Sequence, residues 1–350
     1  MAGRYNRRMR RSTRPGLVAA VLLLVLFGAY AAYWWIVAGR IEDGAAAWRK
    51  SIQTRKVDAS WRSFHVGGFP FHFRVELQDA TFRDRAFSPA PELSLPVLTG
   101  SARPWNFAVW QLRAPEGLAA DLPAAAGRPL LKLAAQTGSG TVALGRQGNT
   151  LLWLNFRDIA AEAGARVPIQ SAVTWIDLPA RPPQAHTEPS LGLAFDLRKL
   201  HLPVSPPNFT DMIDQAAFGV TVKGAVPDGP LLQAIAAWRD AGGTVELDNL
   251  RLDWGGVGVN ANGTAALDQD LQPIGAFSGG IEGFDAILSA LVEAGRLGTE
   301  QAALAQIALN AFAKPGPDGK PQIKTSFTMQ NGEMFLGPVK LGATPRIVWK

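Results

Sequence analysis

Histidine is the natural starting point in a search for chemistry, because imidazole serves as a metal ligand and as a general base near neutral pH. The 350-residue chain has four histidines and no cysteine. The histidines are His65, His72, His186 and His201, and none forms H-E-x-x-H or another spacing typical of metal ligands. The lack of cysteine excludes disulfides, thiol catalysis and cysteine-based metal sites. We therefore expect no metal and no cofactor.

Other catalytic motifs do not occur either. The chain has no G-x-S-x-G nucleophile elbow and no P-loop. The glycine-rich segment 256–263 lacks the dinucleotide-binding spacing and is typical of a strand that carries glycines. Carboxylates such as Asp248 and Asp253 stand among strand residues, where a solvated surface is their ordinary environment. The sequence therefore predicts a protein that is not an enzyme.

The net charge of +6 comes from the N-terminal arm. The first fourteen residues, MAGRYNRRMRRSTR, hold six Arg and no acidic residue. Without that arm the 35 basic residues fall to 29, which equals the 29 acidic residues. A neutral body gives no support to nucleic-acid binding, so we expect no nucleic-acid partner.

Residues 16–38, GLVAAVLLLVLFGAYAAYWWIVA, form an uncharged apolar run after this arm. As a helix the run would be about 35 Å long, enough to cross the hydrocarbon core of a bilayer. The preceding arginines predict a cytoplasmic N-terminus and a periplasmic body in a bacterial inner membrane, and the aromatic cluster of residues 30–35 suits the interface. The alternative is a cleaved signal peptide with a small-x-small site at residues 29–31. Both readings export the body.

The rest of the chain predicts an α+β fold of predominantly long, curved antiparallel β-sheet with a few packed helices. The expected divisions are a basic cytoplasmic tail (1–15), a transmembrane helix (16–38), a helical stalk (39–56), a β-rich first half (57–203) and an α+β second half (204–350). The short apolar and polar patterns predict helices at residues 209–218, 230–241, 284–293 and 299–313.

One phrase recurs in the predicted strands. Residues 75–82 (VELQDATF) and 245–252 (VELDNLRL) alternate apolar and polar residues, slip by one position, and then alternate again. Residues 154–161 and 195–202 share this order. A β-bulge at residues 78–79, 157–158, 198–199 and 248–249 would keep the apolar side chains on one face and bend each strand. Repeated bends would curl the sheet into a gutter. The alternative is a set of ordinary bulged strands over a closed core.

A candidate lipid-facing row precedes the first slip. Apolar residues alternate with polar ones through this stretch, as one face of a strand requires. The row consists of Phe69, Phe71, Phe73, Val75 and Leu77.

Several phrases resemble the bacterial domain-of-unknown-function family 2125. They are GFPF (68–71), LDWG (252–255) with the glycine-punctuated strand that follows, and LGPV (336–339). The resemblance implies a membrane-anchored envelope protein and supplies no catalytic residues. More distantly, the anchor topology and strand style are similar to AsmA-type envelope proteins, whose sheets form lipid-conducting grooves. That likeness is an analogy of architecture.

Three functions remain open at this stage. The first is an inner-membrane-anchored periplasmic protein that binds or passes phospholipid or another envelope lipid, or supports envelope maintenance. The second is an anchored scaffold with a closed core that binds another envelope protein. The third is an envelope hydrolase.

Overall fold

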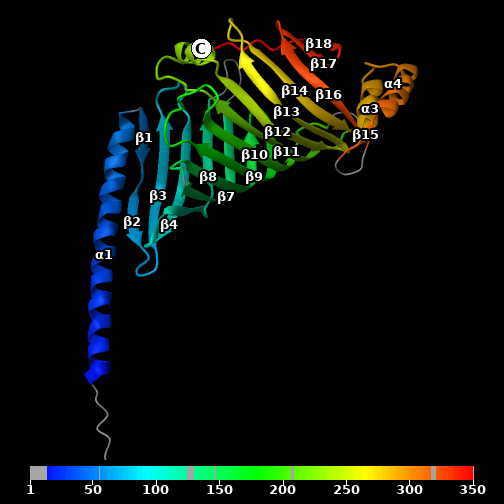
Figure 1. Ribbon diagram of the computed structural model, residues 1–350. Coiled ribbons are helices and arrows are strands. Elements are labelled where there is room, and N and C mark those ends of the chain that lie inside the picture. Colours follow the sequence, from blue (N-terminus) through cyan, green and yellow to red (C-terminus); the bar gives the residue numbers. More distant parts are fainter. Residues whose placement is uncertain are drawn as a thin grey trace, which may run out of the picture.

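The structure is a computed structural model that describes residues 14–54, 56–123, 130–145, 147–205, 209–316 and 321–349. It has one long N-terminal helix, a large antiparallel sheet and three shorter helices (Figure 1). The predicted basic tail lies outside the described residues as far as residue 13.

Helix α1 (Arg14–Gln53) joins the predicted transmembrane helix and the predicted stalk without a break. Its segment from Leu17 onward is long and apolar enough to cross a membrane, and only 6% of its most apolar stretch is buried inside the protein. The C-terminal part lies beside the sheet, and the N-terminal part extends beyond it (Figure 1). Ile41, Ala45 and Ile52, which share one side of the helix, are half-buried. The helix is therefore both a candidate membrane span and one edge of the folded body.

All described strands belong to one sheet. The first nine are β1 (Val57–Ser60), β2 (Ser63–Gly67), β3 (Phe73–Asp84), β4 (Glu92–Arg103), β5 (Asn106–Ala114), β6 (Leu118–Leu122), β7 (Leu131–Leu144), β8 (Thr150–Glu162) and β9 (Arg166–Leu178). The others are β10 (Pro189–His201), β11 (Met212–Lys223), β12 (Thr244–Trp254), β13 (Val257–Leu267), β14 (Pro273–Glu282), β15 (Lys314–Pro315), β16 (Pro321–Gln330), β17 (Glu333–Leu336) and β18 (Val339–Ala343). The shorter helices are α2 (Leu231–Asp240), α3 (Phe284–Glu293) and α4 (Thr299–Phe312).

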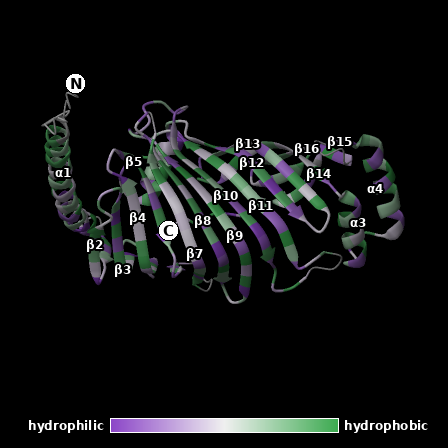
Figure 2. Ribbon diagram, turned by 90° about the horizontal axis from the view of Figure 1, so that it is seen from below, coloured by the Kyte–Doolittle hydropathy of each residue, from purple (hydrophilic) through white to green (hydrophobic). Residues whose placement is uncertain are grey.

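The sheet is an antiparallel meander in which most strands pair with their neighbours in sequence. β1 and β2 share one edge of β3, and β5 and β6 both bridge β4 and β7. From β7 to β14 each strand pairs with the next, and β14 then pairs with β16 across the α3–α4 hairpin. The sheet twists and curves along its length, and α3 and α4 lie at the end far from α1 (Figures 1 and 2). This is the predicted α+β architecture.

The predicted division at residues 203/204 falls in the β10–β11 connection. These two strands pair over nearly their whole length, so the sheet runs through this point without a break. The helix predicted at residues 209–218 is wrong, because Met212–Lys223 form β11. Backbone pairing to β10 and β12 on both sides outweighs the weak helical spacing of that segment.

The slips in alternation take two structural forms. In β12 the ladder shifts by one residue between Leu247 and Leu250, which is the predicted bulge. In β3, β8 and β10 the ladder keeps its register, and one residue instead has a left-handed backbone: Asp79 (φ 50°), Asp158 (φ 52°) and Lys199 (φ 50°). Each of these lies opposite a residue that is also left out of the ladder, Pro96 for Asp79 and Gln170 for Asp158 and Lys199.

The slip therefore forms a crease across the sheet rather than a set of separate bulges. Register is unchanged where neighbouring strands slip at the same level, as β3 and β4 do, and as β7, β8, β9 and β10 do. Between these two groups the crease passes through the turn that separates β5 from β6. Apolar residues stay on one face across it. Leu77, Ala80 and Phe82 pack in one cluster, and Phe156 and Ile159 pack in another.

Candidate functional site

The largest candidate site is one face of the sheet, formed by rows of residues in register. The first row crosses ten strands from β5 to β16, and its members are Trp110, Val142, Leu152, Ile176, Leu193, Val220, Leu247, Gly263, Phe277 and Phe327. A second row runs beside it from Leu112 to Thr325, and a third runs from Ala114 to Ile323. These two rows contain only apolar residues, glycine and two threonines. We call the three rows the apolar face.

The apolar face is large for a monomer's surface. Nine steps between strands at about 4.8 Å make each row about 43 Å long, and three rows cover roughly 900 Å² in outline. Every residue of the first row is half-buried and none is fully buried. In a two-layer domain a central row of this kind would be covered by a second layer. Exposed apolar patches beyond a few hundred Å² mark binding sites.

Two helices cover only parts of this side of the sheet. α1 packs at the first edge, where Trp34 and Ala38 join a cluster with Phe73 and Val75. Further along the sheet, α2 and the C-terminal Trp349 roof a cavity of about 340 Å³ at one end of strands β11–β13, over the row that contains Val222 and Val245. The indole of Trp238 donates to the Lys223 carbonyl (2.7 Å), which fixes α2 over this cavity. Helices α3 and α4 do not cover the rows, since they lie beyond the sheet's end (Figure 1).

The structure divides the predicted lipid-facing row. Phe73 is fully buried and stacks on Trp34 with ring centroids 5.0 Å apart. Val75 is buried in the same cluster, and Leu77 packs against it. Phe69 and Phe71 precede the strand, in the turn of residues 68–72, and are 38% and 66% exposed.

The prediction that all five residues share one strand face is therefore wrong for the first two. Gly68 has a positive φ of 97°, and the His72 amide donates to its carbonyl, so the chain turns before β3 begins. The alternation of Phe69 and Phe71 with polar residues imitates a strand, and only the turn at Gly68 distinguishes it. The sequence reasoning missed the rows from β5 to β16, whose signal is spread over ten strands.

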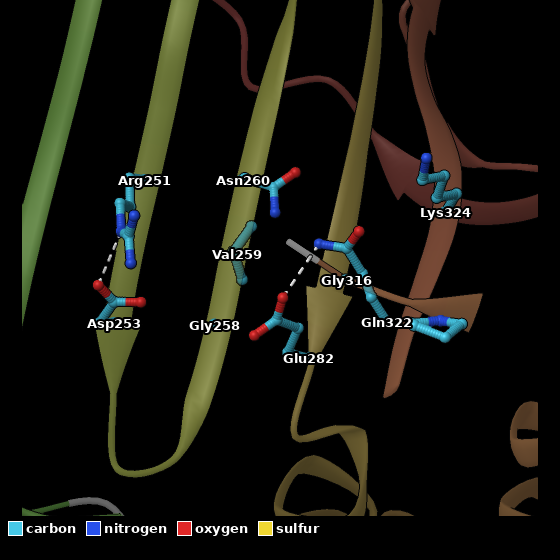
Figure 3. A pocket seen from close by; sticks show the side chains of 10 residues that line it. Arg251, Asp253, Gly258, Val259, Asn260, Glu282, Gly316, Gln322 and Lys324 are labelled. Atoms are coloured by element: carbon cyan, nitrogen blue, oxygen red, sulfur yellow. Dashed lines mark hydrogen bonds and ion pairs between the residues drawn. The ribbon is translucent and has the colours of Figure 1, made fainter. Parts of the chain in front are cut away.

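The opposite face holds a polar cavity of about 530 Å³ (Figure 3). Glu282 and Gln322 are 8% and 3% exposed, and the Gln322 amide donates to the Glu282 carboxylate at 3.3 Å. The Arg251 guanidinium pairs with Asp253 at 2.9 Å. Glycine at position 280 makes room, because a Cβ there would lie 2.3 Å from the Gln322 side chain. The Gln322 amide thus supplies a hydrogen-bond donor to the buried Glu282 carboxylate.

Residues 34–345 match the model of a family described as an uncharacterized protein conserved in bacteria, DUF2125. The chain belongs to the DUF2125 family. No curated protein and no solved structure matches it, so the likeness to AsmA-type proteins stays an analogy. The three phrases that carry the DUF2125 resemblance lie at strand ends and turns, next to β2–β3, β12–β13 and β17–β18.

The histidines of this DUF2125 protein are dispersed. His65 is in β2, His72 in the following turn and His186 in the β9–β10 connection. His201 in β10 lies 3.8 Å from the Asp211 carboxylate. Among the described residues, no group of three or more His, Asp or Glu side chains could hold a metal ion.

Proposed function

We propose that this protein is anchored in the bacterial inner membrane by α1, with its body in the periplasm. The six arginines before the apolar segment support a cytoplasmic N-terminus. The protein is a non-enzymatic carrier that binds or passes phospholipid or another envelope lipid, and so supports envelope maintenance.

The observation that carries this proposal is the apolar face, most of which the described helices leave without a second layer across its ten strands. Acyl chains gain about 0.8 kcal/mol for each methylene group that leaves water. None of the three rows contains a charged side chain, so the face does not select one type of polar headgroup. A face of this length accommodates acyl chains at several positions between α1 and α2.

Photolabelling tests the proposal. Full-length protein is reconstituted in vesicles of phosphatidylethanolamine and phosphatidylglycerol that contain a phospholipid with a diazirine at the end of one acyl chain. We expect label on α1, which serves as the internal positive control, and on the apolar-face residues of β10–β12. Label confined to α1 and the sheet edge beside it would overturn the proposal.

Two variants sharpen the test. Phe218 is 38% exposed on the apolar face and Trp153 is 56% exposed on the opposite face. Phe218→Asp should reduce labelling of β10–β12 several-fold, and Trp153→Asp should leave it unchanged. Equal effects of both variants would count against a face-specific site.

A second candidate function is an anchored scaffold that binds another envelope protein. It is favoured by α4, which has no buried residue and exposes Leu304 (69%), Ile307 (69%) and Phe312 (76%) at the end far from α1. A photo-crosslinker at Ile307 that captures one defined envelope protein, while the apolar face stays unlabelled by lipid, would favour this alternative.

A further inference from the structure

Two hairpin tips of the sheet are held against the aromatic segment of α1. The Tyr30 hydroxyl donates to the Pro70 carbonyl in the β2–β3 turn, and the Tyr33 hydroxyl donates to the Pro104 carbonyl in the β4–β5 turn (3.0 Å). The Trp34 indole donates to the His72 carbonyl (3.2 Å). Tyr30, Tyr33 and Trp34 thus fix the position of both tips along the helix axis.

The tips present aromatic side chains that the fold leaves exposed. Phe71 is 66% exposed and Trp105 is 67% exposed, and Trp35 on the adjacent helix is also 67% exposed. Phe69 fills the space between tip and helix, with its ring 5.9 Å from Phe27 and 5.6 Å from Trp34. Aromatic rings with this exposure are favoured at the boundary between acyl chains and headgroups.

The length of the apolar helix sets the depth of the tips. The described part of the helix begins at Arg14, and the tips are hydrogen-bonded to it from Tyr30 onward. The sixteen residues from 15 to 30 span about 24 Å at 1.5 Å per residue. The hydrocarbon core is about 30 Å thick. If α1 spans the core with Arg14 at its boundary, the Tyr30–Pro70 contact lies about 6 Å inside the core, and the Tyr33–Pro104 contact, about 4.5 Å further along the helix, lies within about 2 Å of the boundary.

The charges next to the tips agree with that depth. Arg103, one residue before Pro104, places its guanidinium 6.0 Å from the centre of the Trp105 ring. Arg74 follows the other tip and is exposed. Basic side chains beside an interfacial aromatic ring lie at the level of lipid phosphates.

We infer that the β2–β3 and β4–β5 tips insert Phe71 and Trp105 into the bilayer that α1 crosses. The partner of this surface is the lipid bilayer itself. The membrane thus holds the sheet at three points, α1 and the two tips, and fixes the sheet's tilt. The inference rests on α1 as a membrane span, and it stands whether or not the apolar face carries lipid.

The lack of cysteine makes a direct test available, because each single-cysteine variant carries one label. Nitroxide labels are placed on Phe71→Cys and Trp105→Cys in full-length protein in phosphatidylethanolamine/phosphatidylglycerol vesicles. Leu23→Cys, 66% exposed on α1, is the membrane control. Phe87→Cys, 57% exposed in the β3–β4 turn at the other end of β3, is the water control.

Collisions with oxygen and with a water-soluble nickel chelate are then compared. We expect labels at positions 71 and 105 to collide with oxygen more than with nickel, with an intermediate depth between those of positions 23 and 87. Nickel accessibility equal to that of position 87 would overturn the inference. Protection from both reagents would also overturn it, since that result indicates a protein contact.

Discussion

Replacing Phe73 by alanine tests how the anchor is joined to the sheet. Phe73 is fully buried and stacks on Trp34 of α1 with an interplanar angle of 10°. Phe218 is the matched control, because it is also a strand phenylalanine beside another aromatic ring, Phe195 at 5.2 Å, but it is 38% exposed. If Phe73 lay on an open lipid-facing surface, the two substitutions would have similar effects.

The expected magnitudes differ clearly. Phe→Ala at a fully buried position costs about 3–5 kcal/mol, because burial is lost and a cavity remains. Phe218→Ala should cost about 1–2 kcal/mol, since part of its surface is already in contact with solvent. For a body of this size, 1 kcal/mol shifts the melting temperature by about 2–3 °C. We therefore expect a decrease of roughly 6–15 °C for Phe73→Ala and roughly 2–6 °C for Phe218→Ala.

The assay is thermal unfolding of the detergent-solubilised full chain, followed by tryptophan fluorescence. A double-mutant cycle with Trp34→Ala isolates the contact between the rings, and we expect a coupling free energy of about 0.5–1.5 kcal/mol. Equal shifts for both phenylalanines, together with a coupling near zero, would refute the packing of α1 on this strand.

Two further predictions concern single positions, and one concerns the topology of the chain. Gly263→Ala should destabilise the sheet by about 1–3 kcal/mol in the same melt, because the new Cβ would lie 2.3 Å from the Ala276 carbonyl oxygen, whereas Gly39→Ala, with nothing within 4 Å, should not. Lys199 has a φ of 50°, so Lys199→Val should lower the free energy of unfolding by about 1–2 kcal/mol, whereas Lys199→Asn, which tolerates that backbone, should leave it almost unchanged. Equal melting temperatures for the two variants would argue against the left-handed crease. A reporter fused after Lys350 should be active only in the periplasm, and mass spectrometry should find Arg4 to Arg14 retained; a mature start at residue 32 would show cleavage instead.

Patterns contained within one continuous segment of the sequence predicted the structure well. The apolar run predicted the membrane-length part of α1, and the helical spacing of Ile41, Ala45, Trp48 and Ile52 predicted its continuation, although Trp48 is 49% exposed. Helices α3 and α4 begin and end within a residue or so of the predicted ranges. These segments have a dense local pattern, which tertiary contacts did not need to override.

Features that depend on residues far away in the sequence could not be predicted from the local pattern. Phe73 looks the same in sequence whether it faces lipid, solvent or Trp34, which lies 39 positions earlier in the chain. Residues 209–218 have the spacing of a helix, yet residues 212–223 form β11 because β10 and β12 offer backbone partners on both sides. Burial and pairing of this kind are decided by the whole sheet.

The crease shows how a weak signal becomes clear only across strands. Four phrases revealed the slip, but the strands between them contain it too: Ile169 and Ala172 in β9 lie on one face although three positions separate them, as do Ala135 and Gly138 in β7. Alanine and glycine at these places hide the apolar pattern in a single strand. A slip confined to one strand would shift the ladder, as it does in β12. A slip shared by all neighbours keeps the register and bends the whole sheet at one level, so the apolar face continues unbroken across the bend.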